Sequence, residues 1–218
     1  MKKFEDSYRH KGLRKKLVET VRSKGITDEK VLDAIGSIPR HFFLDSAFED
    51  KAYEDKAFPI AEGQTISQPY TVAYQTQLLE LKPFEKVLEI GTGSAYQASV
   101  LAEMGVQVYT IERQKKLFDQ IRRFKYLDKY RNIKFFYGDG YEGLPTYSPF
   151  DKILITAAAP VIPPKLIEQL KPGGMMVIPV GTGDVQKMMR ITKQPAGSIR
   201  EEVFDNFSFV PMISGKND

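Results

Sequence analysis

The 218-residue sequence contains no cysteine, which excludes disulfide bonds and thiolate zinc sites. Because the same absence fits a reducing compartment, we expect a cytoplasmic protein. Its two histidines and scattered acidic residues show no spacing typical of metal ligands, so no metal site is expected. No apolar run is long enough to cross a membrane, and no apolar stretch of a signal peptide follows the charged N-terminus. We therefore expect no membrane association.

Positive charge is in mild excess, with a formal net charge of +4. Basic residues are concentrated in residues 9–16 and 113–134. Aromatic residues also occur in the second stretch, but their spacing is typical of a helix packed on a sheet rather than of a nucleic-acid surface. We therefore interpret both stretches as solvated helices and expect no nucleic-acid partner.

The first 60 residues are predicted to be mainly helical. Residues 4–24 carry leucines and valines on one face among many charges, and a second short helix is expected to follow Thr27 as its cap and to end near Gly36. We expect one domain over residues 1–218, in which residues 1–60 form a helical addition packed on a core of residues 61–218.

Apolar strands alternate with helices from residue 69 onward. Helices are predicted over residues 69–81, 96–104, 114–127 and 163–170, and strands over residues 86–90, 107–111, 132–137, 151–156 and 175–180. The last strand is expected to follow a turn at Pro172-Gly-Gly174. This alternation predicts an α/β protein with a doubly wound, mostly parallel sheet of the Rossmann-like type. Two more strands, 186–193 and 201–212, are expected to lie antiparallel at one edge, which gives seven in all.

A glycine-rich segment, Glu89-Ile-Gly91-Thr-Gly93-Ser-Ala95-Tyr96, follows the first of these strands. Ligands of doubly wound sheets bind at the carboxyl ends of the strands, and the two glycines allow the backbone to turn tightly beside a ligand. A dinucleotide-binding loop requires glycine or alanine where Tyr96 stands, so a nicotinamide-dependent oxidoreductase is disfavoured. By itself, the segment is equally consistent with a tight strand-to-helix turn.

Acidic residues end the next two strands. Glu112 stands 19 residues after Gly93, where a carboxylate can accept hydrogen bonds from both ribose hydroxyls, and Asp139 lies between two glycines. An isolated acid at such a position is usually a turn former or a helix cap. Three such features in consecutive strand–helix units instead predict a nucleoside site. They resemble the pattern of class I methyltransferases, which implies S-adenosyl-L-methionine as cofactor and S-adenosyl-L-homocysteine as product.

The segment that follows the fourth strand, Thr156-Ala-Ala-Ala-Pro160, contains no ionisable residue that could remove a proton. Its composition suggests an acceptor that is already ionised, such as a carboxylate. Ser67, in the loop Gly63-Gln-Thr-Ile-Ser-Gln-Pro-Tyr70, is well placed to bind a carboxylate. The alternative is that Ser67 only caps the helix that begins at Pro69.

Taken together, the motifs resemble the protein-L-isoaspartate O-methyltransferase family over about residues 38–212. The Gln-Thr-Ile-Ser-Gln-Pro-Tyr string is specific to this family, whereas the glycine loop marks only the superfamily. The resemblance implies a repair enzyme that methylates the free α-carboxyl of L-isoaspartyl residues in damaged proteins and peptides. The ester then cyclises unaided to a succinimide, which hydrolyses partly to aspartate. Activity on D-aspartyl sites stays open.

The resemblance also assigns residues. It implies that Ser67 is the catalytic residue and that the substrate contacts Ile66, Ser67, Gln68, Val210 and Pro211. Glu89 and the glycine loop border the methionine of the cofactor, Glu112 the ribose, and Asp139 with Gly140 the adenine. The full set of implied cofactor residues is Glu89, Gly91, Thr92, Gly93, Ser94, Glu112, Asp139 and Gly140.

Three positions depart from the family pattern. Ala95 replaces a third glycine and is expected to require a negative φ, and Met212 replaces a leucine. His41 replaces an acidic residue and is expected to have a surface or packing role. Other S-adenosylmethionine enzymes acting on RNA or small molecules, and a catalytically silent binding module, remain alternatives. Nothing in the sequence demands more than a monomer.

Overall fold

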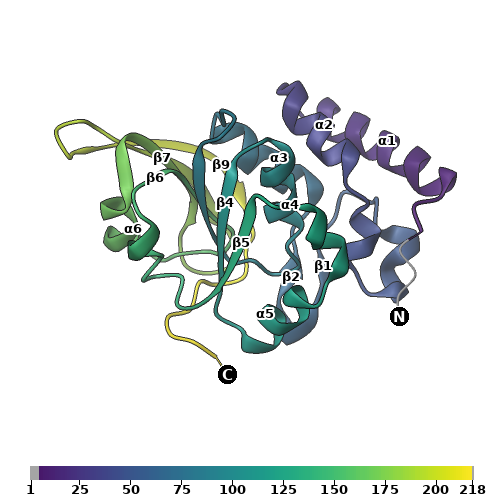
Figure 1. Ribbon diagram of the computed structural model, residues 1–218. Helices are drawn as coiled ribbons and strands as arrows, with labels where there is room; N and C mark the ends of the chain where they lie inside the picture. The colour runs from purple at the N-terminus through teal and green to yellow at the C-terminus, as the bar shows by residue number, and fades with distance from the viewer. Residues whose placement is uncertain (1–4, 218) are drawn as a thin grey trace.

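The apolar strand segments form one seven-stranded sheet in the computed structural model, which describes residues 5–217 (Figure 1). Its order is β5-β4-β3-β6-β7-β8-β9. The strands are β3 (Lys86–Ile90), β4 (Gln107–Glu112), β5 (Ile133–Tyr137), β6 (Phe150–Ile155), β7 (Leu170–Val180), β8 (Gln186–Lys193) and β9 (Ile199–Phe207). All neighbours from β5 to β7 pair in parallel, whereas β8 and β9 add antiparallel. The predicted doubly wound, mostly parallel sheet with an antiparallel edge is therefore confirmed.

Helices cover both faces of this sheet. They are α1 (Tyr8–Ser23), α2 (Glu29–Ser37), α3 (Pro69–Leu78), α4 (Tyr96–Glu103), α5 (Lys115–Arg122) and α6 (Pro164–Glu168). Short 3-10 turns are η1 (Arg40–Phe43), η2 (Ser46–Lys51), η3 (Ala61–Gly63), η4 (Lys125–Lys129) and η5 (Pro145–Tyr147). A two-stranded antiparallel ribbon, β1 (Phe58–Pro59) with β2 (Thr65–Ile66), connects the N-terminal part to α3. Among residues 5–217, no helix is both long and apolar enough to cross a membrane.

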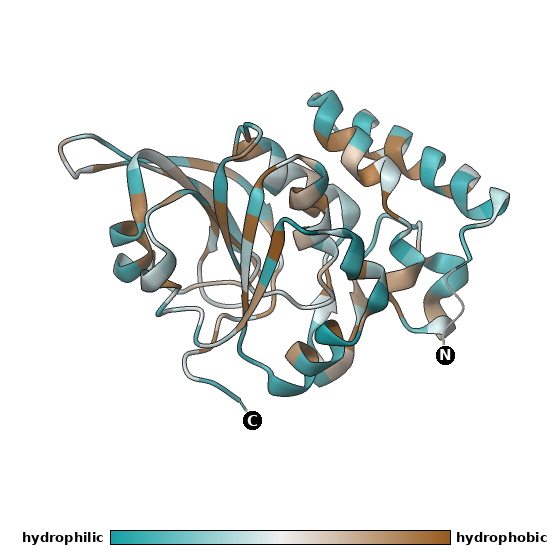
Figure 2. Ribbon diagram, viewed as in Figure 1, coloured by the Kyte–Doolittle hydropathy of each residue, from teal (hydrophilic) through white to brown (hydrophobic). Residues whose placement is uncertain are grey.

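Two hydrophobic cores lie on opposite faces of the sheet. The larger one joins Leu17 of α1 and Ile35 of α2 to Leu101 of α4 and Val108 of β4, all fully buried or nearly so. The smaller one packs Leu166 of α6 against the other face. Apolar residues accordingly concentrate on the strands and on the inward sides of α1 and α2 (Figure 2). The N-terminal helices thus share a core with the sheet through α3 and α4.

Three local predictions were wrong. The cap of α2 is Asp28, one residue later than predicted, and its carboxylate accepts hydrogen bonds from the amides of Lys30 and Val31. The amides of Thr27 and Asp28 both donate to Gln77 Oε1. Pro172-Gly-Gly174 is no separate turn but part of β7, which begins at Leu170 and pairs with β6 across a shift of register. The last strand ends at Phe207 rather than at residue 212, so the residues after it run as an irregular segment.

His41 has a packing role, as expected. It is 3% exposed, its Nδ1 lies 2.6 Å from the Tyr53 hydroxyl, and its ring stacks on His10 at 3.9 Å between centroids. Burial lowers the pKa of the His41 imidazole, which keeps the ring neutral at pH 7. Asp6 lies close enough to both histidines to suggest a cation site, but both of its oxygens accept hydrogen bonds from Arg14.

Candidate active site

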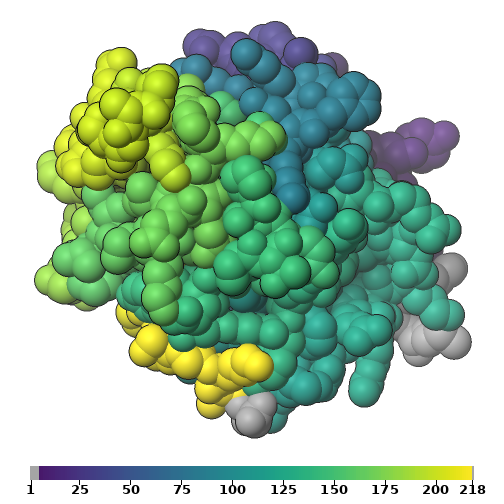
Figure 3. Space-filling model, turned by 60° about the vertical axis from the view of Figure 1, so that its left-hand side comes forward, coloured from purple at the N-terminus to yellow at the C-terminus, as the bar shows by residue number. Residues whose placement is uncertain are grey.

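A cavity lies at the carboxyl ends of β3 and β4, beside the point where the strand order reverses between β3 and β6. Ligands of doubly wound sheets bind at this position. Its walls come from the glycine loop after β3, the end of β4 and the segment of residues 208–217 that follows β9, which we call the C-terminal segment. We call this opening the glycine-loop cavity. The C-terminal segment, yellow in Figure 3, lies against the teal and green parts of the surface on this side.

Two glycines are needed for the close packing of this cavity. Gly91 has φ +95°, and a Cβ there would lie 2.6 Å from Thr156 Oγ1. The Thr156 hydroxyl lies 2.8 Å from the Gly91 carbonyl oxygen, to which it donates, so the contact locks the loop onto the end of β6. A Cβ on Gly140 would lie 2.4 Å from Ile90 Cγ2. A side chain at either position would therefore displace the cavity wall.

Glu112 connects the end of β4 to the glycine loop. Its side chain is buried, and its two carboxylate oxygens accept hydrogen bonds from the amides of Gly93 and Gln114, each at 2.9 Å. A carboxylate has about four acceptor positions, so two remain beside the cavity that Glu112 lines. A pair of vicinal hydroxyls needs two such positions, and the contact between Glu112 and a ribose stays a prediction.

Glu89 does not line the cavity. It is fully buried, one of its oxygens accepts the Thr110 hydroxyl, and Oε1 has no hydrogen-bond partner within residues 5–217. The Thr110 hydroxyl also lies 2.7 Å from that of Thr92 in the glycine loop. Burial raises the pKa of Glu89 to about 8, with the Thr110 hydrogen bond lowering it and the charge of Glu112 raising it. At neutral pH, Glu89 is therefore mostly protonated. Its connection to the glycine loop is the chain of hydrogen bonds through Thr110 and Thr92.

Asp139 likewise does not line the cavity, although its neighbour Gly140 does. The Asp139 carboxylate accepts hydrogen bonds from the Tyr141 amide at 2.9 Å and from the Gly215 amide at 2.6 Å. It thereby fastens the C-terminal segment to the end of β5. A contact between Asp139 and adenine stays a prediction.

A second opening, which we call the Ser67 cleft, adjoins the glycine-loop cavity. Residues from α3, the end of β9 and the C-terminal segment line it, and four residues line both openings: Thr65, Ser67, Thr156 and Val210. Ser67 is half-buried at this junction. The helix α3 has Gln68 at its N-cap position without a side-chain cap, so Ser67 does not cap it. The capping alternative for Ser67 is therefore wrong.

The other predicted substrate residues lie around the same junction. Ile66 and Pro211 line the glycine-loop cavity, Gln68 lines the Ser67 cleft, and Val210 lines both. Thr156 shares this position and was not among the predicted site residues. It directly follows β6, so the carboxyl-end rule that selected Glu112 would also have selected Thr156.

Ala95 corrects one sequence-based expectation. Its φ is +66°, in the left-handed region, whereas a negative value was expected. The Ala95 amide donates to the Thr92 carbonyl at 2.8 Å, and this tight turn leads directly into α4 at Tyr96. A left-handed alanine costs about 1–2 kcal/mol. The turn needed at the start of α4 outweighs that local cost.

The sheet order and the residues that line the glycine-loop cavity define a class of protein. The cavity offers a carboxylate for a ribose, a glycine loop that a ligand can approach closely, and apolar walls from Ile90 and Ile111 for a base. These groups fit S-adenosylmethionine, whose nucleoside and amino-acid parts need those partners. The chain has the fold and site of a class I S-adenosylmethionine-dependent methyltransferase.

Comparison with known proteins narrows the class to a family. Residues 12–217 match the model of the family described as protein-L-isoaspartate(D-aspartate) O-methyltransferase, and the chain belongs to this family. It is 56% identical over 214 residues to the protein-L-isoaspartate O-methyltransferase of Christiangramia forsetii, covering 98% of this chain and 100% of that one. It is 58% identical over 210 residues to that of Cytophaga hutchinsonii, covering 96% and 95%.

A solved structure supports the same relationship. The crystal structure of a beta-aspartate methyltransferase from Plasmodium falciparum, in complex with S-adenosyl-L-homocysteine, aligns with a TM-score of 0.80 and 26% identity. The alignment covers 92% of this chain and 98% of that one. The family resemblance inferred from the sequence is thus confirmed, as is S-adenosylmethionine as the cofactor.

Proposed function

We propose that this enzyme methylates the free α-carboxyl of L-isoaspartyl residues in damaged proteins and peptides at the junction of the two openings, with Ser67 as the catalytic residue. The observation that carries the proposal is the meeting of the glycine-loop cavity and the Ser67 cleft at Ser67, Thr156 and Val210. A cofactor in the cavity and a peptide in the cleft can approach each other only there.

The residues at the junction suit a reaction that needs no base. Bound S-adenosylmethionine supplies an electrophilic methyl group on a sulfonium sulfur. An isoaspartyl carboxylate, already ionised at neutral pH, forms the new oxygen–carbon bond as the carbon–sulfur bond breaks, so no proton is moved. Ser67 is a neutral hydroxyl residue that can orient the carboxylate without titrating, whereas the Thr156 hydroxyl already donates to the carbonyls of Ile90 and Gly91 and shapes the junction. The acceleration then comes from holding the two reactants in line.

The lining of the glycine-loop cavity supports a proposal for the cofactor residues. We propose that Gly91, Thr92, Gly93 and Ser94 border the amino-acid part of the cofactor and that Glu112 binds the ribose hydroxyls. Gly140 would lie beside the adenine. Because Glu89 does not line the cavity, we propose that it acts by holding the glycine loop through Thr110 and Thr92. We propose that Asp139 holds the C-terminal segment and also contacts the adenine beside Gly140.

A paired-peptide assay tests the function. The enzyme and labelled S-adenosylmethionine are incubated with two peptides that differ only in an isoaspartyl or an aspartyl residue. Base-labile label is expected in the isoaspartyl peptide alone. Ser67→Ala should lower turnover by at least about tenfold, the scale of one lost hydrogen bond to a charged group, with S-adenosylhomocysteine binding retained. Unchanged turnover would remove Ser67 from the mechanism.

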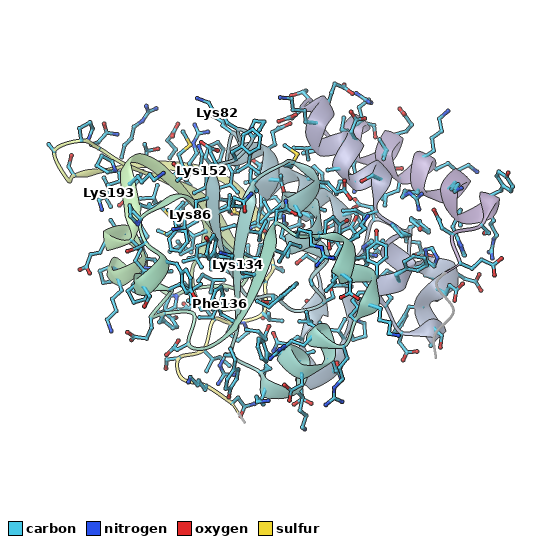
Figure 4. The ribbon with its side chains drawn as sticks, in the orientation of Figure 1. Lys82, Lys86, Lys134, Phe136, Lys152 and Lys193 are labelled. Atoms are coloured by element: carbon cyan, nitrogen blue, oxygen red, sulfur yellow. The ribbon has the colours of Figure 1, made fainter. Side chains whose placement is uncertain are left out.

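An RNA substrate is the main alternative, and the lysines labelled in Figure 4 bear on it. Lys86 and Lys134 lie at the amino-terminal parts of their strands, away from the cavity, and each ammonium lies 5.0 Å from the centroid of the Tyr109 ring. Lys193 donates to carbonyls at the end of α6. Since these cations have partners within the chain, we propose no nucleic-acid partner. Label in RNA but not in the isoaspartyl peptide would reverse this assignment.

We further propose one domain over residues 1–218, acting as a monomer in the cytoplasm. The core that α1 and α2 share with the sheet supports the single domain, and the absence of cysteine fits a reducing compartment. A single unfolding transition and the mass of a monomer in light scattering are the expected results. Cell fractionation tests the location.

A further inference from the structure

Arg40 in η1 is the largest fully buried polar side chain among residues 5–217, with 0% exposure. Its guanidinium donates three hydrogen bonds, all to backbone carbonyls. Nη1 lies 2.7 Å from the Ala52 oxygen, and Nη2 lies 3.0 Å from the oxygens of both Lys56 and Ser67. Arg40 therefore ties the Ser67 main chain to the segment between η2 and β1.

The surroundings of this guanidinium leave its charge without a carboxylate in hydrogen-bond contact. Its carbon lies 5.5 Å from the Phe58 ring centroid and 5.6 Å from that of Tyr96, and Nε has no partner within residues 5–217. Burial lowers the pKa of Arg40 to about 10, so the group stays charged at neutral pH. A buried cation is costly unless it is paired or hydrogen-bonded, and here the three carbonyls supply the compensation, so the charge and the position of these carbonyls depend on each other.

Arg14 provides the contrast. It is also buried, at 7% exposure, but its guanidinium forms a two-pronged pair with Asp6, with both contacts at 3.0 Å. That pair neutralises the charge within the N-terminal helices and lines neither the glycine-loop cavity nor the Ser67 cleft. Arg40 differs in holding a backbone carbonyl of the Ser67 loop while its positive charge remains unneutralised at hydrogen-bond distance.

Asp55 fixes the other flank of the same loop. Its carboxylate accepts hydrogen bonds from Gln68 Nε2 at 2.9 Å and from the Tyr70 amide at 2.8 Å. Lys24 pairs with the same carboxylate at 2.6 Å and offsets its charge. Ser67 is thus held between two anchors. The Asp55 carboxylate also acts on the Arg40 charge, but with Lys24 paired to Asp55 the three groups together keep one net positive charge.

We propose that Arg40 is a positioning residue of the acceptor site, which holds Ser67 at the junction of the two openings and favours an anionic group beside it. This inference rests on the proposed role of Ser67 in binding a carboxylate. The donated hydrogen bond fixes the Ser67 carbonyl, and with it the backbone position from which the Ser67 side chain projects. The buried charge below the loop attracts the carboxylate of the acceptor in a medium where screening is weak.

Three variants test the proposal. Arg40→Lys keeps the positive charge, but its single ammonium cannot bind all three carbonyls. Arg40→Met removes the charge and the three hydrogen bonds. Arg14→Met removes a buried guanidinium elsewhere. The measurements are kcat/KM and KM for an isoaspartyl peptide, the dissociation constant of S-adenosylhomocysteine, and Tm. For Arg40→Met, we expect the peptide KM to rise about 10- to 100-fold, the scale of a charge-assisted hydrogen bond, with S-adenosylhomocysteine affinity within about twofold of the native value. Arg40→Lys should recover part of this loss.

The control separates positioning from general destabilisation. Arg14→Met should lower Tm as much as Arg40→Met without raising the peptide KM. If Arg40→Met does not fold, Arg40→Lys and Arg14→Met still make the comparison. An unchanged peptide KM in Arg40→Met or, where that variant does not fold, in Arg40→Lys would overturn the inference, as would an equal rise in Arg14→Met. A native enzyme that does not methylate the isoaspartyl peptide would instead contradict the proposed function.

Discussion

The Glu112 carboxylate accepts the amide of Gly93 at 2.9 Å and so joins two residues that are 19 positions apart. The acid expected to bind ribose therefore also shapes the glycine loop. The same hydrogen bond ties the end of β4 to the glycine loop, so the two parts of the proposed cofactor site keep a fixed position relative to each other.

Replacing Glu112 tests this double role. Glu112→Gln keeps one acceptor oxygen but loses the charge, and it should weaken S-adenosylhomocysteine binding about 10- to 100-fold, as expected for about 1.5–3 kcal/mol from hydrogen bonds to a charged group. Titration calorimetry measures the affinity. Exposed Glu168→Gln serves as the control and should bind normally. Native affinity in Glu112→Gln would contradict the ribose assignment.

Glu89 predicts a pH-dependent stability. Its pKa rises on folding from 4.5 to about 8 through burial, so its favourable contribution is present below about pH 4.5 and is lost as pH rises through 8. Glu89→Gln stays neutral and can still accept the Thr110 hydroxyl. Its advantage in free energy of unfolding over the native chain should therefore grow between about pH 5 and 8 and then level off. Urea titrations at several pH values measure this difference, and a constant difference would argue against a protonated Glu89.

The left-handed conformation of Ala95 predicts that a glycine at this position would stabilise the protein. Because its φ of +66° strains alanine but not glycine, Ala95→Gly should remove a strain of about 1–2 kcal/mol, offset in part by one lost buried methyl group of about 0.8 kcal/mol. A small net gain in stability is expected. Ala95→Val, which adds a β-branched side chain at the same φ, should lower Tm strongly. A lower Tm in the glycine variant would show that packing of the methyl group outweighs the strain.

The burial of Lys152, near the start of β6, predicts that an apolar replacement would stabilise the protein (Figure 4). It is 5% exposed, and its ammonium lies 3.4 Å from the Met175 sulfur. Burial lowers its pKa below 10.5, while Glu85 and Glu80 raise it, so the charged form is disfavoured on folding. Lys152→Met should add about 1–2 kcal/mol of stability at pH 7, because a buried charge is replaced by an apolar chain of similar length.

The pH dependence of that gain provides its check. A depressed lysine pKa means that the native side chain contributes its full stability above pH 10.5 and loses it as pH falls through the folded pKa. The advantage of Lys152→Met in urea titrations should therefore shrink as pH rises from the folded pKa toward 10.5. Lys134→Met, at an exposed position, should change stability little. Equal effects of the two substitutions would contradict a penalty specific to burial.

The sequence alone predicted the elements whose signals are local. The strand over residues 86–90 matches β3 at both ends, and that over 186–193 matches β8, because continuous apolar runs and flanking turns act over a few residues. The glycine loop and Glu112 were identified for the same reason: parallel strands bring their carboxyl ends to one edge, whatever their order.

Only the tertiary structure decided where several of these side chains point. Asp139 meets Gly215, 76 residues later, and Arg40 meets the Ser67 carbonyl, 27 residues later. Neither contact follows from a local pattern, because each depends on which segments pack together and on which buried polar groups still need partners. Glu89 likewise turned out to be buried rather than cavity-lining. The sequence therefore determined the chemistry present at the strand ends, and packing decided which of these groups line the cavity and which hold the loops around it.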